Sequence, residues 1–197
     1  MPASTTRASD LPGRVRGSLL REWDRGVRSR WGERAVQQVT ADVRAAGLDV
    51  PDRIQSGEWY PSGLQIAITE AMLGRFLGDD PSALERVLLE DVRERLGRAR
   101  LTMARVLGPG RLVAHAPSLF SHAYDVGCLE NVGSGIGSSG AGTTLRHVGS
   151  PLFANPTWQH LQVAAWRTVF ALTAPNATPR VRELERGSDC FVVELRW

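Results

Sequence analysis

The C-terminal third of the sequence constrains the fold most, because a helix that is apolar nearly all round precedes a regularly alternating strand. Asn155-Pro156 opens the helix, which runs to about Leu172 and carries large apolar side chains on two sides, as in a helix buried on more than one face. The final segment alternates, so that one face of a strand carries Phe191, Val193, Leu195 and Trp197. That face needs a cover, and the apolar helix can supply it. The sequence therefore predicts an α+β fold, with helices packed on an antiparallel sheet and a C-terminal β-hairpin turning at Gly187-Ser188.

The sequence before this region predicts mainly helices. After a short strand at residues 13–17, apolar residues recur at helical spacing to Ala46, and again over residues 64–76. The motif GDDP opens another helix, with Asp80 as its N-cap and Pro81 in its first turn. The apolar stripe of this helix is expected to face the core at Leu84, Val87, Leu88, Val92, Leu96, Ala99, Met103 and Val106. A chain of 197 residues fits a flexible tail over residues 1–12 and a single domain over residues 13–197.

The stretch GIGSSG, residues 135–140, matches the G-x-G-x-x-G pattern of a dinucleotide-binding turn. That turn needs a helix directly after the glycines, because the helix N-terminus holds the pyrophosphate. Here the strand-like Thr143-Thr144-Leu145 follows, and the next acid after Glu130 is Glu183, too distant to bind the ribose. We therefore interpret residues 133–142 as a mobile glycine-rich connection, whose only function would be that of a lid or a partner-binding loop.

The charged residues are distributed unevenly. All 24 basic residues are arginine, and residues 1–34 hold eight of them against four acids. Such a segment can contact nucleic acid or another anionic surface, although a solvated amphipathic helix explains the same pattern. No apolar run approaches the roughly 20 residues of a membrane helix, and the N-terminus lacks the apolar core of a secretory signal. We therefore expect a cytoplasmic protein without a membrane span, in which Cys128 and Cys190 are reduced.

Residues with catalytic or metal-binding chemistry form no recognisable constellation. The sequence contains no G-x-S-x-G, H-E-x-x-H or CxxC motif, so we predict that the protein is not an enzyme. His115 and His122 lie seven residues apart, but without further ligands at matching spacing they are interpreted as ordinary histidines. Trp59 and Tyr60 form either an exposed interaction patch or a capped corner.

The aromatic residues near the C-terminus allow two interpretations. They can line a small apolar pocket between the helix of residues 156–172 and the terminal sheet, or they can simply fill the core. The residues concerned are Trp158, Trp166, Phe170 and Phe191.

Several short motifs occur in a recognisable order, namely VRG, WYP, GDDP, LGPGRLVAHAPSLFSHAYDVG and the closing CFVVELRW. From Gly13 to Trp197 this order resembles a paralogous family of similar length, expanded in myxobacteria and catalogued as a domain of unknown function. That family is distantly similar to haem–nitric-oxide-binding and four-vinyl-reductase type domains, which are mixed α/β folds around a small-molecule pocket. The resemblance implies a sensory or scaffolding module rather than an enzyme.

Two departures from that pattern bear on cofactors. Only Cys190 stands where four-vinyl-reductase-like sensors hold zinc with a cysteine cluster, and the tyrosine-serine-arginine signature that binds haem propionates is missing. We therefore predict no zinc, no haem and no other cofactor. The leading hypothesis is a non-catalytic domain that senses a small apolar ligand or binds a protein partner. The alternative is a nucleic-acid-associated regulator that uses the arginine-rich N-terminal segment, and its binding would depend on salt.

Overall fold

The structure is a computed structural model that describes residues 7–137, 140–174 and 180–197. These residues form two compact units. Unit 1 comprises the chain up to Asp79 together with His122–Val126, and unit 2 comprises Asp80–Ser121 and Gly127–Trp197. The single domain expected over residues 13–197 stays a prediction.

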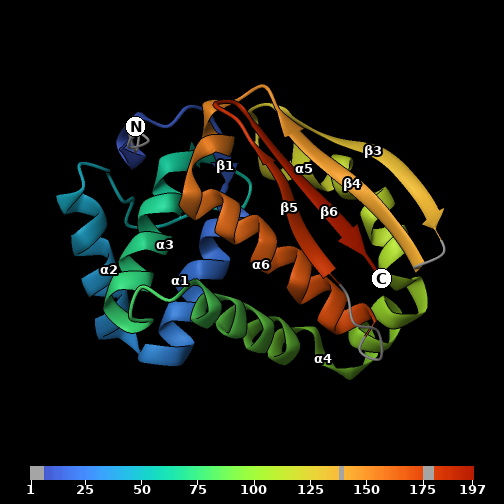
Figure 1. Cartoon of the computed structure of the whole chain (residues 1–197). Helices are drawn as coiled ribbons and strands as arrows, with labels where there is room; N and C mark the ends of the chain where they lie inside the picture. Colours follow the sequence, from blue (N-terminus) through green and yellow to red (C-terminus); the bar gives the residue numbers. More distant parts are fainter. Residues whose placement is uncertain (1–6, 138–139, 175–179) are drawn as a thin grey trace. The chain divides into compact units, whose positions relative to one another are not determined.

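Unit 1 consists of helices and a two-stranded antiparallel ribbon (Figure 1). Its elements in chain order are η1 (Ala8–Asp10), β1 (Arg14–Arg16), α1 (Gly17–Trp31), α2 (Glu33–Ala45), β2 (Trp59–Pro61) and α3 (Ser62–Phe76). The predicted first strand is confirmed, and it pairs with the WYP motif. The long helix predicted to reach Ala46 is instead two helices, because Gly32 has a φ of 82°, a conformation that glycine adopts without steric cost.

The core of unit 1 is built around α3. Its buried side chains are Leu64, Gln65, Ile66, Ala67, Ile68, Thr69, Met72 and Leu73, so the helix is enclosed on nearly every side. α2 contacts both α1 and α3. Burial on several faces explains why α3 carries almost no charged residues over its first two turns.

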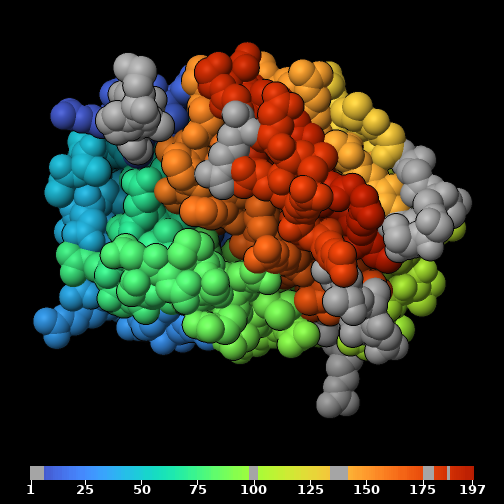
Figure 2. Space-filling view, in the orientation of Figure 1, coloured from blue at the N-terminus to red at the C-terminus, as the bar shows by residue number. Residues whose placement is uncertain are grey.

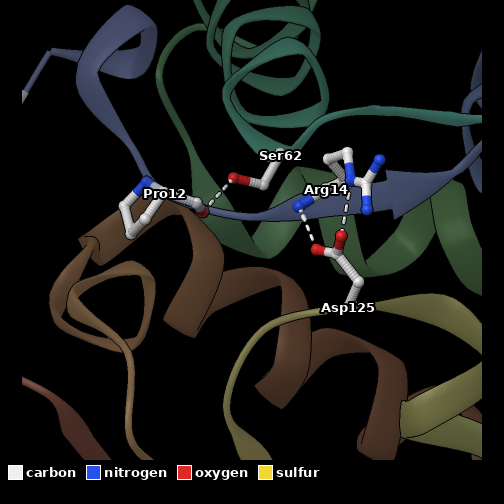
Figure 3. A network of polar contacts seen from close by, with 4 residues as sticks. All are labelled: Pro12, Arg14, Ser62 and Asp125. Atoms are coloured by element: carbon white, nitrogen blue, oxygen red, sulfur yellow. Dashed lines mark hydrogen bonds and ion pairs between the residues drawn. The ribbon is translucent and has the colours of Figure 1, made fainter.

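The N-terminal residues pack against the start of α3. Leu11 is buried, and the Ser62 hydroxyl donates a hydrogen bond of 2.8 Å to the Pro12 carbonyl (Figure 3). A Cβ atom on Gly63 would collide with the Ala8 carbonyl, so η1 approaches α3 as closely as backbone allows. Residues 8–12 are therefore folded where the sequence indicated a flexible tail over residues 1–12. Residues 1–6 lie outside the described residues.

The segment His122–Val126 belongs to unit 1 because β1 holds it. The Asp125 carboxylate accepts hydrogen bonds from the backbone N–H and the guanidinium of Arg14 (Figure 3). Burial acts to raise the pKa of Asp125, but the bonds from Arg14 outweigh it and lower that pKa. The Tyr124 hydroxyl donates to Oε1 of Gln65 over 2.9 Å, which ties the segment to α3.

Unit 2 contains the antiparallel sheet. Its elements are α4 (Pro81–Ala114), α5 (Ala116–Ala123, whose last two residues belong to unit 1), β3 (Cys128–Gly137), β4 (Gly140–Val148), η2 (Pro151–Ala154), α6 (Pro156–Thr173), β5 (Arg180–Arg186) and β6 (Cys190–Arg196). The strand order is β3-β4-β6-β5, so the last two strands form the predicted C-terminal hairpin. Both predicted helix starts are confirmed, since the side chains of Asp80 and Asn155 each accept a 2.9 Å hydrogen bond from a backbone N–H of the first turn.

α6 covers the face of β6 that the alternation predicted. The ring centroids of Phe170 and Trp197 lie 5.8 Å apart, and Phe191, Val193 and Leu195 are completely buried. α6 runs alongside β5 and β6 in Figure 1, and in Figure 2 its orange surface lies against their red surface. The predicted fold class, helices packed on an antiparallel sheet with a terminal hairpin, is confirmed. No helix in the described ranges is long and apolar enough to cross a membrane.

The interpretation of residues 133–142 as a mobile connection is wrong for the described residues. The chain up to Gly137 belongs to β3, and β4 begins at Gly140 and pairs with it. A Cβ atom on Gly142 would lie 2.9 Å from the Leu195 carbonyl oxygen, so one of these glycines serves close strand packing. A strand rather than a helix follows these glycines, as the sequence predicted, so the helix N-terminus of a dinucleotide-binding turn is not formed here. Residues 138–139 lie outside the described residues.

The apolar stripe of α4 is core only in its first half. Leu84 is completely buried, whereas Met103 is 65% exposed and Val106 is 81% exposed. Gly97 and Gly108 have φ values of 64° and 69°, which interrupt the helical geometry within α4. Because the chain changes direction at Gly97, apolar residues at constant helical spacing before and after this glycine do not lie on one common face. The prediction that the stripe is core as far as Val106 is therefore wrong.

Candidate functional site

A cleft of about 890 Å³ lies within unit 1, between α1, α2 and the segment of residues 50–54. Its volume falls in the roughly 300–1,000 Å³ range of small-molecule sites. Buried aliphatic side chains form its floor, namely Leu20, Val27, Val39, Val43 and Ile68. The cleft was not foreseen, because its floor residues look like ordinary core positions in the sequence.

Two arginines hold the loop of residues 47–58, which forms one wall of the cleft. α2 is followed by Gly47, whose φ of 85° turns the chain back along the helices. Arg44 donates a 3.1 Å hydrogen bond to the Val50 carbonyl, and Arg21 donates a 2.9 Å bond to the Ser56 hydroxyl. The loop is thus attached to α2 near its start and to α1 near its end, with the cleft between these attachments.

The rim of the cleft is charged, and most of its charges are paired. Arg28 pairs with Asp24 at 3.1 Å and also with Glu33. Arg44 lies 3.9 Å from the carboxylate of Asp52.

The residues that line the cleft span the sequence from Leu20 to Ile68, and these ion pairs involve all three acids among them. Two further arginines line it, Arg21 and Arg53, and within the described ranges neither pairs with a carboxylate. The rim therefore combines ion pairs with two guanidinium groups that form no ion pair with a described carboxylate.

Trp59 and Tyr60 form a capped corner next to the wall of the cleft, which decides between the two interpretations of this pair. The guanidinium carbon of Arg16 lies 3.9 Å from the centroid of the Trp59 ring, a cation–π contact. The Tyr60 hydroxyl accepts a 2.9 Å hydrogen bond from the backbone N–H of Gln55. Both aromatic side chains are half-buried. They fix the end of the loop and do not form an exposed patch.

The four aromatic residues predicted from the sequence lie in unit 2, where they form two pairs. The ring centroids of Trp158 and Phe191 are 6.1 Å apart, and those of Trp166 and Phe170 are 6.4 Å apart. Trp158, Phe170 and Phe191 are completely buried and Trp166 is half-buried. Such burial is what the core-filling interpretation expects. A ligand pocket at these residues stays a prediction.

His147 of β4 is a chemically distinctive residue that the sequence analysis missed. It is completely buried, and the ring centroids of Phe120, Phe153, Trp158 and Phe191 lie 4.9–6.1 Å from its own. Neither ring nitrogen has a hydrogen-bond partner among the described residues. Burial lowers the pKa of His147 to about 3, so the imidazole is neutral at neutral pH.

The position of His147 could have been found from the strand alternation. Thr143, Leu145 and His147 are all buried on one face of β4, and a histidine in register with a core leucine should point inward. His115 and His122, which the sequence did single out, have exposed side chains.

The fold is similar to that of solved H-NOX structures. The Fe(II) unliganded H-NOX protein from K. algicida aligns with a TM-score of 0.56 and 10% identity, over 92% of this chain and 96% of its own. A mutant of T. tengcongensis H-NOX aligns with a TM-score of 0.53 and 13% identity, over 92% and 97%. An oxygen-binding H-NOX domain related to soluble guanylate cyclases gives 0.50 and 12%, over 92% and 94%. At these identities the similarity establishes the fold alone.

Sequence comparison adds no closer relative. No protein-family model matches the chain, and no curated protein matches it. The distant similarity to haem–nitric-oxide-binding domains therefore holds at the level of the fold. The resemblance to the myxobacterial family stays a prediction.

Two places were compared with the needs of a haem group, the cleft of unit 1 and the surroundings of His147, and neither fits one. Haem iron needs an axial His, Cys, Met or Tyr side chain that faces a cavity. None of the residues lining the cleft between Leu20 and Ile68 is of these types. His147 is the buried imidazole of unit 2, and aromatic rings enclose it too closely to admit a porphyrin. No group of three or more metal-binding side chains occurs in the part of the chain that the structure describes, and the absence of zinc stays a prediction.

Proposed function

We propose that this protein is a non-catalytic domain that senses a small molecule bound in the cleft of unit 1. The observation that carries the proposal is the cleft itself, which combines ligand-sized volume, an aliphatic floor and a polar rim. The fold gives independent support, because one of the structures similar to this chain is an oxygen-binding domain.

The side chains around the cleft favour binding over catalysis. A general acid or base must have its side chain available to exchange a proton with the substrate. The acids of the cleft, Asp24, Glu33 and Asp52, are each engaged in an ion pair with an arginine. The lining residues from Leu20 to Ile68 include no Cys or His, and the one hydroxyl group among them belongs to Thr40.

The wall of the cleft offers a route by which binding could be signalled within unit 1. The loop leads directly into β2, and β2 pairs with β1 over three residues. β1 in turn holds the segment of residues 122–126 through Arg14 and Asp125 (Figure 3). A ligand that orders the loop would therefore stabilise the β1–β2 ribbon and its hold on that segment.

The arginine-rich N-terminal segment does not favour the nucleic-acid alternative. Most of its arginines in the described part of the chain already contact other residues of the protein, among them Arg14, Arg16, Arg25, Arg28 and Arg30. A guanidinium that is already bound to its own chain contributes less to a phosphate contact, and no observation favours this function.

Native mass spectrometry of the protein purified from its own host tests the proposal, together with hydrogen exchange before and after removal of the bound molecule. We expect a co-purifying small molecule, and slower exchange of residues 47–58 when it is present. The proposal is wrong if the protein is a bare polypeptide and no compound in a broad small-molecule screen slows exchange in that loop.

A further inference from the structure

We infer that the cleft of unit 1 binds an amphipathic organic anion, an aliphatic chain ending in a carboxylate, with Arg21 and Arg53 as the residues that receive the charge. The inference rests on the proposed function, because it specifies the ligand class of the same cleft. It draws on two separate features, the chemistry of the floor and the balance of charge at the rim.

The floor and walls of the cleft are suited to an aliphatic chain. Branched aliphatic residues line it on α1, on α2, on the loop and on α3, namely Leu20, Val27, Val36, Val39, Val43, Val50, Ile54 and Ile68. Among the residues that line the cleft from Leu20 to Ile68, Trp23 is aromatic, and Gln37 and Thr40 have neutral polar side chains. Such a surface rewards the burial of methylene groups, each worth about fourfold in affinity.

The rim requires an anion rather than a neutral molecule or a cation. Four arginines and three acids line the cleft, and the acids are paired with Arg28 and Arg44. This leaves the charges of Arg21 and Arg53 without a counterion from the described chain. Arg21 is already oriented by its bond to Ser56 and keeps further N–H groups for a ligand. A guanidinium binds a carboxylate through two parallel hydrogen bonds, so a terminal carboxylate suits these groups well.

A nucleic acid or an extended polyanion fits the cleft poorly. It would satisfy the two arginines but would leave the aliphatic floor exposed to water, which costs free energy in proportion to the apolar area. A single anionic group attached to a hydrocarbon chain satisfies both parts of the cleft.

Isothermal titration calorimetry of the full chain with decanoate, kept below micelle-forming concentrations, tests the inference. We expect one site, affinity falling about fourfold per methylene from decanoate to octanoate, and at least about tenfold weaker binding of decanol. Arg21→Gln and Arg53→Gln should each weaken decanoate binding by about three- to tenfold, because each removes one charge-assisted contact at an exposed rim.

Two further variants place the site and control for general charge. Arg34→Gln removes an exposed arginine of α2 that does not line the cleft, and we expect wild-type affinity. Val36→Glu puts a negative charge on a half-buried position of the cleft, and we expect decanoate binding to be lost while the protein stays folded.

The outcomes separate the ligand class from the proposed function. Equal affinity for decanol and decanoate, or no loss in either arginine variant, overturns the anionic ligand. A neutral molecule found by native mass spectrometry, with binding lost in Val36→Glu, overturns the ligand class and leaves the sensing function standing. If decanoate does not bind and no other small molecule is found, the ligand class and the sensing function are both wrong.

Discussion

The cleft of unit 1 and the aromatic cluster around His147 in unit 2 are both lined by apolar side chains, yet one is open and the other closed. In the cleft, aliphatic residues project from α1 and α2, and a loop held by Arg21 and Arg44 keeps the space between them open. In unit 2, four aromatic rings close around one imidazole. Apolar composition therefore does not decide whether a space stays open between two elements. The spacing of the elements and the volume of the side chains between them decide it.

Polar groups also differ between the two regions. The cleft keeps its charges at the rim, where they are paired and partly exposed, whereas unit 2 encloses an imidazole without a hydrogen-bond partner among the described residues. A buried polar group without a partner usually marks a functional site or a stored cost in stability. Four aromatic rings pack around His147, so we expect the second explanation to hold. The following experiments test it and the contrast between the two regions, from the largest expected effect to the smallest.

Trp158→Ala should destabilise the protein by about 3–5 kcal/mol, because it removes a completely buried ring from the aromatic cluster. Urea unfolding measures the loss, and Val36→Ala in the cleft is the matched control, with an expected loss below about 1 kcal/mol because Val36 is half-buried. A small loss for Trp158→Ala, combined with weaker binding of the co-purified molecule, would instead place the ligand in unit 2 and remove the contrast between the regions.

His147 should make the stability depend on pH. Its pKa is about 3 in the folded protein and near 6.5 when unfolded, so below pH 6.5 the unfolded state takes up the proton and is favoured. The stabilising contribution is complete above pH 6.5 and decreases as the pH falls toward 3. Lowering the pH from 7 to 5 should therefore cost about 2 kcal/mol through this residue.

Urea unfolding of the wild type and His147→Leu at both pH values tests this effect. The variant should lose less stability on acidification, whatever its stability at pH 7. His122→Gln is the control, because His122 is exposed, and it should follow the wild type. An identical pH dependence of wild type and His147→Leu would show that the imidazole is not enclosed.

Asp125→Asn should weaken unit 1 by about 1 kcal/mol, because it removes a carboxylate that accepts two hydrogen bonds from partly exposed Arg14. The pKa of Asp125 is lowered in the folded state, so the contribution is present above the ordinary aspartate pKa of about 3.9 and is lost below it. Hydrogen exchange of residues 122–126 at pH 7 should become faster. Asp49→Asn, an exposed position, should leave exchange in that segment unchanged.

Arg44→Gln should have the smallest effect on stability, about 0.5 kcal/mol or less, since it removes an exposed ion pair and one hydrogen bond to the loop. The variant should also release the loop from α2, so we expect faster hydrogen exchange at residues 50–54. Unchanged exchange there would show that Arg44 does not hold the wall of the cleft.

Much of the fold of unit 2 could be predicted from the sequence, because its signals are local. The alternation of the last strand, the apolar helix before it and the capping residues Asp80 and Asn155 are each visible within a few residues, and the structure confirms them. The direction of α4 beyond Gly97 could not be predicted from such local signals. A glycine at positive φ redirects the chain without changing the hydrophobic pattern around it.

The residues of the candidate site could not be identified from local sequence signals either. Val39 and Val43 have the helical spacing of core residues, and they are buried, yet they also line the floor of a cleft. Nothing in their spacing distinguishes a floor from a filled core. Of the four aromatic residues singled out from the sequence, Trp158, Phe170 and Phe191 are completely buried and Trp166 is half-buried.

By itself, the sequence determined the apolar helix before the last strand, which face of β6 is buried and where the helices after Asp80 and Asn155 begin, because periodicity and capping act over one or two turns. Only the tertiary structure decided which apolar faces meet and which stay apart. It enclosed His147 in aromatic rings and left the charges of Arg21 and Arg53 at an open rim. The physical reason is that the space between two elements depends on where separate segments are anchored to each other, as α1 is to the loop after α2. Such contacts join residues that are distant in the sequence, and they leave no periodic signal in the chain.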